Sequence, residues 1–157
     1  MIWSVINFGT HKGKTLPQVL FSDPDWFFWA IEEGVFQNRG TLRGQAADLN
    51  TKARHIKVPA RHGTNMLVEY VIHPPTGKFA HIELVPASQP HHDGSSPTFR
   101  KSEIDLSIPR QIAQYDKLGC KNMLKSAKFY LFGSERTRMT KERCEEFFDD
   151  VSNFIRT

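Results

Sequence analysis

MLVEYVIHPPTGKFAHIELV, at residues 66–85, holds two runs rich in β-branched and aromatic side chains. The runs are separated by Pro74-Pro75-Thr76-Gly77, a segment whose proline and glycine residues favour a tight turn. Two such runs joined by a short turn predict an antiparallel β-hairpin. We therefore expect a small antiparallel sheet near the middle of the chain, with helical segments on either side of it.

The segment before the hairpin, residues 1–60, is expected to form a small module built on a glycine turn and an aromatic helix. Residues 2–8 are rich in β-branched and aromatic types, and this favours a short strand. The strand should end at a turn formed by residues 9–13, which begins and ends with glycine. A short helix is expected to follow from Leu16.

An aromatic helix is predicted next in this module. Asp23 suits the N-cap of that helix and Pro24 its first position, and Gly34 should end it. The helix contains Trp26-Phe27-Phe28-Trp29, and four consecutive residues sweep about 300° around a helix axis. At least one of these rings should therefore reach the surface or a neighbouring subdomain. A ring at the surface would serve as a stacking platform for an unpaired base.

A longer helix should start at an N-cap on Thr41 and end before Pro59. Its apolar residues recur at steps of four and three, as expected for one buried stripe. They are Leu42, Ala46, Leu49, Ala53 and Ile56. The other side carries the basic residues Arg39, Arg43, Arg54 and Lys57.

The segment after the hairpin is expected to be mainly helical. Residues 103–108 favour a strand, and residues 109–118 and 120–132 favour two helices separated by Gly119, although 129–132 also suit a strand. Thr140 should cap a last helix with one apolar face. That face consists of Cys144, Phe147, Phe148, Val151, Phe154 and Ile155.

These segments predict an α+β fold. A glycine-turn and aromatic-helix module at residues 1–60 precedes a β-hairpin and helical C-terminal half at 61–157, and the alternative that the two parts form one compact unit stays open. At 157 residues the chain is long enough for one good hydrophobic core. No window approaches the ~18 consecutive apolar residues of a membrane span, so we expect no membrane partner and a cytoplasmic protein.

The distribution of charge and the cysteines indicate a basic helix face and buried thiols. The net charge of +4 is modest, but residues 100–128 carry seven basic and three acidic groups. Within them, lysines at 117, 121, 125 and 128 recur at steps of four, four and three, which predicts a basic helix face. Cys120 and Cys144 fall on apolar faces, so we expect buried free thiols rather than a disulfide.

The N-terminal motif resembles a known module. Phe8-Gly9-Thr10-His11-Lys12-Gly13-Lys14-Thr15-Leu16, followed by Asp23-Pro24-Asp25-Trp26-Phe27-Phe28-Trp29, is similar to the C-terminal module of exodeoxyribonuclease X-like proteins. The resemblance covers about the first third of the chain and departs from the usual pattern at Thr10 and His11. It implies a nucleic-acid context. A P-loop fits less well, because its pattern needs four residues between the first glycine and Gly-Lys-Thr, and here there are three.

The favoured hypothesis is a non-catalytic DNA- or RNA-binding accessory or regulatory protein. Basic side chains would contact backbone phosphates, and a tryptophan would stack on a base. The candidate residues are Lys12, Lys14, Arg43, Arg54, Lys121 and Lys125 for phosphates, and Trp26 and Trp29 for stacking. The sequence nominates no catalytic residue, metal ligand or cofactor.

Two other functions stay open. The first is a protein-interaction adaptor or inhibitor that uses exposed aromatics and the hairpin edge. A metal-dependent hydrolase would need His91, His92 and an unidentified carboxylate. In the expected hairpin register, Tyr70 pairs with His81, which puts His73 and His81 on opposite faces, where they cannot share a metal. Glu103-Ile104-Asp105 is expected to carry the exposed charges of a strand.

Overall fold

The computed structural model describes residues 1–91, 94 and 96–155, and these confirm the α+β fold. The helices are α1 (Leu16–Leu20), α2 (Pro24–Glu32), α3 (Thr41–Ala53), α4 (Ile108–Ile112), α5 (Lys117–Phe132) and α6 (Lys141–Asp149). The strands are β1 (Ile56–Lys57), β2 (Met66–His73), β3 (Lys78–Pro86), β4 (Thr98–Lys101) and β5 (Glu103–Ile104). Short 3-10 helices cover Ala60–His62 and Val151–Asn153.

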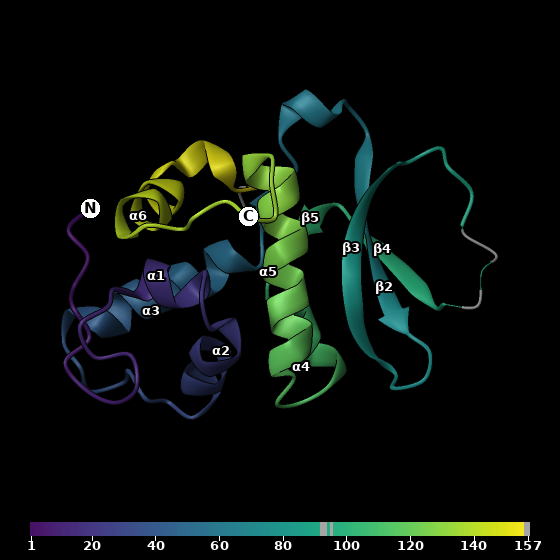
Figure 1. Ribbon diagram of the computed structural model, residues 1–157. Helices are drawn as coiled ribbons and strands as arrows, with labels where there is room; N and C mark the ends of the chain where they lie inside the picture. The colour runs from purple at the N-terminus through teal and green to yellow at the C-terminus, as the bar shows by residue number, and fades with distance from the viewer. Residues whose placement is uncertain (92–93, 95, 156–157) are drawn as a thin grey trace.

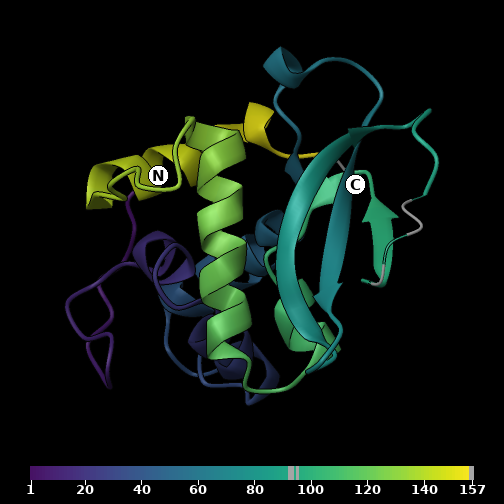
Figure 2. The same ribbon diagram turned by 45° about the vertical axis from the view of Figure 1, so that its right-hand side comes forward.

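Helix α5 is the central element of the fold. It stands between the antiparallel sheet β3-β2-β4 on one side and the helices α1, α2, α3 and α6 on the other (Figures 1 and 2). It packs against β3 and also contacts α2. One hydrophobic core cluster contains residues from both 1–60 and 61–157, including Phe28 and Tyr70. Among the described helices, none has the length and apolar character needed to cross a membrane.

The predicted hairpin forms, with one change of register. His73 pairs with Lys78 as expected, but the register shifts between Val71 and Ile72. His81 therefore pairs with Val71 rather than with Tyr70, and the prediction for that pair is wrong. A β-bulge in β3 is the physical reason, since one extra residue moves every later pair by one position. Because Val71 and His73 lie on one face of β2, the bulge brings His81 to the face of His73.

The N-terminal segment forms less β structure than expected. Instead of a strand over 2–8, it has a single antiparallel bridge between Val5 and Thr15. The glycine turn folds back tightly: Ile6 N–H donates to the Lys14 carbonyl, and Gly13 N–H to the Ile6 carbonyl, both at 2.8 Å. Helix α1 begins at Leu16, as predicted. The residues after Thr15 are therefore helical and cannot extend the β-bridge into a longer strand pair.

Helix boundaries in this module follow the expected capping residues, except at α3. The Asp23 carboxylate accepts a hydrogen bond from Trp26 N–H (3.2 Å), and Pro24 is the first residue of α2. At α3 the N-cap is Gly40, and Thr41 is the first helical residue, so the predicted Thr41 cap is wrong. The Thr41 hydroxyl instead hydrogen-bonds the Ser4 hydroxyl. The predicted apolar stripe is confirmed for Leu42, Ala46, Leu49 and Ala53, which are buried. Ile56 is buried too, but α3 ends at Ala53, and Ile56 lies in β1, where it pairs with Ile104.

Gly119 does not separate two helices. Helix α4 ends at Ile112, and α5 begins at Lys117 and runs through Gly119 to Phe132, so residues 129–132 are helical. The N-cap of α5 is Asp116, whose carboxylate accepts from Gly119 N–H at 2.8 Å. A Cβ at position 119 would lie 2.1 Å from Asp116 Oδ2, so the missing side chain makes room for the cap.

Gly119→Ala is therefore expected to destabilise the protein by about 1 to 2 kcal/mol, because the methyl group displaces a buried capping carboxylate. Gly44→Ala is the matched control. Gly44 also lies in a helix, α3, but an added Cβ there meets nothing within 4 Å. That substitution should stabilise the protein by about 0.5 to 1 kcal/mol. Urea unfolding measures both variants, and equal shifts of the two would contradict the capping role of Asp116.

The last helix is capped as predicted, since the Thr140 side chain accepts from Arg143 N–H at 3.2 Å. It ends at Asp149, earlier than its apolar pattern suggests. Cys144, Phe147, Phe148 and Phe154 are buried, whereas Val151 is 65% exposed. Val151 lies in the following 3-10 turn, which redirects the chain so that Phe154 can pair with Ile56.

Candidate nucleic-acid interface

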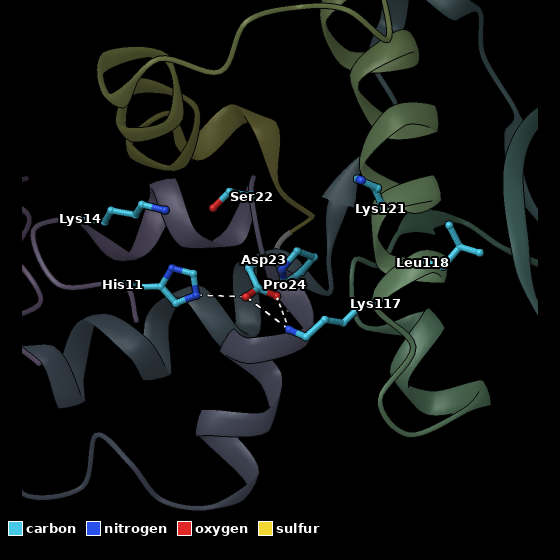
Figure 3. Close-up of a pocket in the computed structure, with 8 residues that line it drawn as sticks. All are labelled: His11, Lys14, Ser22, Asp23, Pro24, Lys117, Leu118 and Lys121. Carbon is cyan, nitrogen blue, oxygen red and sulfur yellow. Dashed lines mark hydrogen bonds and ion pairs between the residues drawn. The ribbon is translucent and has the colours of Figure 1, made fainter. Parts of the chain in front are cut away.

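A cleft of about 550 Å³ lies between the start of α2 and the first turns of α5. The N-terminal module lines one wall with His11, Lys14, Ser22, Asp23 and Pro24, and α5 lines the other with Lys117, Leu118 and Lys121. In Figure 3, Lys117 and Lys121 point from α5 toward the N-terminal wall, whereas Leu118 points away from it. We call this feature the basic cleft.

Three lysines contribute to the basic cleft from distant parts of the chain. Lys14 follows the glycine turn, whose backbone bonds to Ile6 fix the position of the loop. Lys117 and Lys121 are one helical turn apart on α5, so their side chains lie on the same helix face. Lys125 continues this row by one more turn and is exposed, as is Lys12 on the glycine turn. The row of lysines on α5 therefore extends beyond the cleft to Lys125.

Asp23 connects the two walls. Its Oδ2 lies 3.0 Å from His11 Nε2, and its Oδ1 lies 3.2 Å from Lys117 Nζ (Figure 3). Burial by itself would raise the pKa of Asp23, but the hydrogen bonds from Trp26 N–H, Lys117 and His11 outweigh burial and lower it. The carboxylate thus stays ionised and offsets much of the Lys117 charge. Lys14 and Lys121 are left as the main positive charges facing the cleft.

A buried ion pair between Arg110 and Asp25 joins α4 to α2 near the cleft. Arg110 in α4 donates to Asp25 at 3.0 Å, and both side chains are about 95% buried. Arg110 also contacts Glu32 at the end of α2. Burial opposes the charge of Arg110, but its hydrogen bonds to Glu32 and Asp25 raise its pKa overall. These contacts hold α2 against α4, the helix that comes before α5 in the chain. They therefore help to fix the two walls of the cleft relative to each other.

The structure places the predicted stacking residues partly inside the core. Trp26 and Trp29 are half-buried and pack against the hydrophobic core cluster. The Trp26 ring makes an edge contact with His11 (4.8 Å between centroids) and another with Phe36 (5.9 Å). Phe27 and Phe28 are fully buried, so the four consecutive rings divide between core and surface as their spacing predicts.

The two predicted arginines lie away from the basic cleft. Arg43 is exposed and lines a different cavity, together with Phe36 and Ala46. Arg54 is held within the fold: it donates to Ser107 Oγ at 2.8 Å and to Asn50 Oδ1 at 3.0 Å. The structure therefore brings Lys14 and Lys121 together but leaves Arg43 and Arg54 elsewhere.

Sequence reasoning did not select three of the cleft residues, His11, Asp23 and Lys117, as binding residues. The i, i+4 spacing of Lys117 and Lys121 was a usable signal, because it places both on one helix face. His11 and Asp23 carried no such signal. Their roles depend on a fold-back of the glycine turn onto the start of α2, which brings His11 Nε2 against the helix cap.

Candidate catalytic and metal-binding groups are not brought together in the described residues. No group of three or more His, Cys, Asp or Glu side chains there can hold a metal ion. His91 is exposed, and His92 lies outside the described residues. Cys120 and Cys144 are buried and free, as predicted, and burial raises their thiol pKa to about 12 and about 11.

The prediction that Asp105 carries an exposed charge on a strand is wrong. The side chain is 2% exposed and accepts from Ser107 N–H (2.8 Å) and from Lys101 Nζ (3.0 Å). The strand β5 ends at Ile104, so Asp105 begins the turn into α4 and its carboxylate organises that turn. Its role in the fold is structural.

Comparison with known proteins adds nothing to this geometry. The chain matches no family model, no curated protein sequence and no solved structure.

Proposed function

We propose that this protein binds nucleic acid without catalysing a reaction on it, as an accessory or regulatory factor in the cytoplasm. One observation carries the proposal: Lys14 and Lys121, from two basic segments that are far apart in the sequence, line the same cleft. Lysines converging on one surface from separate elements suit the phosphates of a polyanion. Lys12 and Lys125 extend the charged surface beyond the cleft.

The chemistry of the cleft supports binding rather than turnover. Its acidic group, Asp23, is engaged by Lys117 and His11, and its hydroxyl group, Ser22 Oγ, donates to the Gln18 carbonyl at 2.9 Å. The resemblance of the glycine turn to a module that accompanies nucleases supports the same nucleic-acid context. The role we assign is contact with backbone phosphates, which carries little sequence preference of its own.

The test is fluorescence anisotropy with labelled DNA and RNA oligonucleotides over a range of salt concentrations. We expect binding that weakens steeply as salt rises. The double variant Lys14→Gln/Lys121→Gln should lower the affinity by about ten-fold and reduce the slope of log affinity against log salt by about 2, because two phosphate contacts are lost.

Lys57→Gln is the matched control. Lys57 is an exposed lysine that lines a separate cavity formed with Phe147 and Pro59, so its loss changes the net charge but not the basic cleft. Because Lys57→Gln removes one charge and the double variant removes two, a loss of half as many log units of affinity in Lys57→Gln would mean that overall charge governs binding. No binding by the wild-type protein at low salt would refute the proposal and favour the protein-interaction alternative.

A further inference from the structure

We propose that the nucleic acid bound at the basic cleft is single-stranded and that Tyr115 stacks on one of its unpaired bases. This inference rests on the proposed function and adds the class of ligand. Tyr115 lies two residues before Lys117, in the short connection between α4 and α5. Its side chain is 68% exposed, and the α5 wall of the cleft begins two residues later.

The backbone at Tyr115 adopts an unfavourable conformation. Its φ is +56°, in the left-handed region that glycine and asparagine adopt far more easily than a bulky aromatic residue. A buried ring would recover this cost through packing, but Tyr115 is largely exposed. An exposed aromatic ring kept at a strained position is typical of a functional contact.

A fixed contact orients the ring. The guanidinium carbon of Arg110 lies 5.4 Å from the centroid of the Tyr115 ring. Arg110 itself is immobilised by its ion pair with buried Asp25. The cation therefore holds the ring in place and leaves most of its surface to solvent, as a stacking platform requires.

Apolar and basic side chains follow Tyr115 on α5. Leu118 is 70% exposed and borders both the basic cleft and a second cavity on the sheet side of α5, so it offers an apolar contact at the edge of the cleft. Lysines for the phosphates and an aromatic ring for the base are the two components of single-strand recognition. A paired base in a duplex is already stacked and cannot lie on Tyr115, so the arrangement favours an unpaired strand.

The test compares wild type with Tyr115→Ala on single-stranded DNA and RNA oligonucleotides, on a DNA duplex of the same sequence, and on an abasic single strand. Tyr115→Ala should weaken single-strand binding by about ten-fold, as expected for one lost base stack. It should leave duplex and abasic binding unchanged. Tyr115→Phe, which keeps the ring, should bind like wild type. A single strand containing 2-aminopurine should lose fluorescence on binding wild type and recover it with Tyr115→Ala.

Phe129→Ala is the matched control, because Phe129 is a 52% exposed aromatic residue at the opposite end of α5. It should leave affinity unchanged. If wild type binds no oligonucleotide, the proposed function and this inference both fail. If wild type binds but Tyr115→Ala binds single strands equally well, or loses duplex and single-strand affinity alike, only the stacking role fails. The DNA and RNA arms show which strand is preferred.

Discussion

Arg110→Leu is expected to lower the free energy of unfolding by about 3 to 4 kcal/mol, the largest effect among these predictions. The substitution leaves Asp25, whose side chain is 4% exposed, as a buried carboxylate without its hydrogen-bonded cation. Lys117 Nζ, 3.5 Å from Asp25 Oδ2, still offsets part of the charge and keeps the loss near the lower end of the range for broken buried pairs. Urea unfolding followed by tryptophan fluorescence measures the change.

Two further variants separate the buried pair from the surface contact. Glu32 is the second partner of Arg110, but its side chain is 50% exposed, so Glu32→Gln should cost less than about 1 kcal/mol. The double variant Asp25→Asn/Arg110→Leu removes both charges and should recover part of the stability lost in Arg110→Leu. A single variant Arg110→Leu with wild-type stability would show that the buried pair contributes nothing to the fold.

Tyr70→Phe is expected to cost about 2 to 3 kcal/mol, although it removes one oxygen atom. The Tyr70 side chain is fully buried, and its hydroxyl donates to the Glu103 carbonyl (2.7 Å) and accepts from Asp105 N–H (2.8 Å). Removing the hydroxyl leaves two backbone groups without these partners at the point where β5 leads into α4. Such desolvated, unpaired groups are costly.

Tyr130→Phe is the matched control for this effect. Tyr130 is half-buried on α5, and its hydroxyl makes no hydrogen bond with the described residues. Its loss should change the free energy of unfolding by less than about 0.5 kcal/mol. Equal costs in Tyr70→Phe and Tyr130→Phe would mean that the hydroxyl of Tyr70 does not hold the β5–α4 turn.

Local signals predicted most of the secondary structure. The α2 and α6 caps, the apolar stripe of α3 and the β2–β3 hairpin each depend on residues within a few positions of one another, so their spacing is enough. The predictions were wrong where the usual preference of a residue type was overridden by a contact with a nearby residue. Gly119 resembles a helix stop, but its position three residues after Asp116 makes it part of a helix cap.

The sequence predicted some residues of the candidate site and not others, because local spacing does not show where a helix face points in the folded protein. Lys14 and Lys121 were selected from a motif and a helical spacing, and both line the basic cleft. Arg43 and Arg54 have an equally plausible spacing on α3. Only the packing of that helix distinguishes them, because it directs Arg54 to Ser107 and Arg43 to another cavity.

The sequence by itself determined most of the helices and the central hairpin, and that basic groups concentrate in two segments, because both follow from neighbouring residues. The tertiary structure alone decided which of these groups meet. Asp25 and Arg110 are 85 positions apart, and Asp23 and Lys117 are 94 apart. No local pattern relates such residues, since their contacts exist only after α2, α4 and α5 share a core. The basic cleft is a product of that packing.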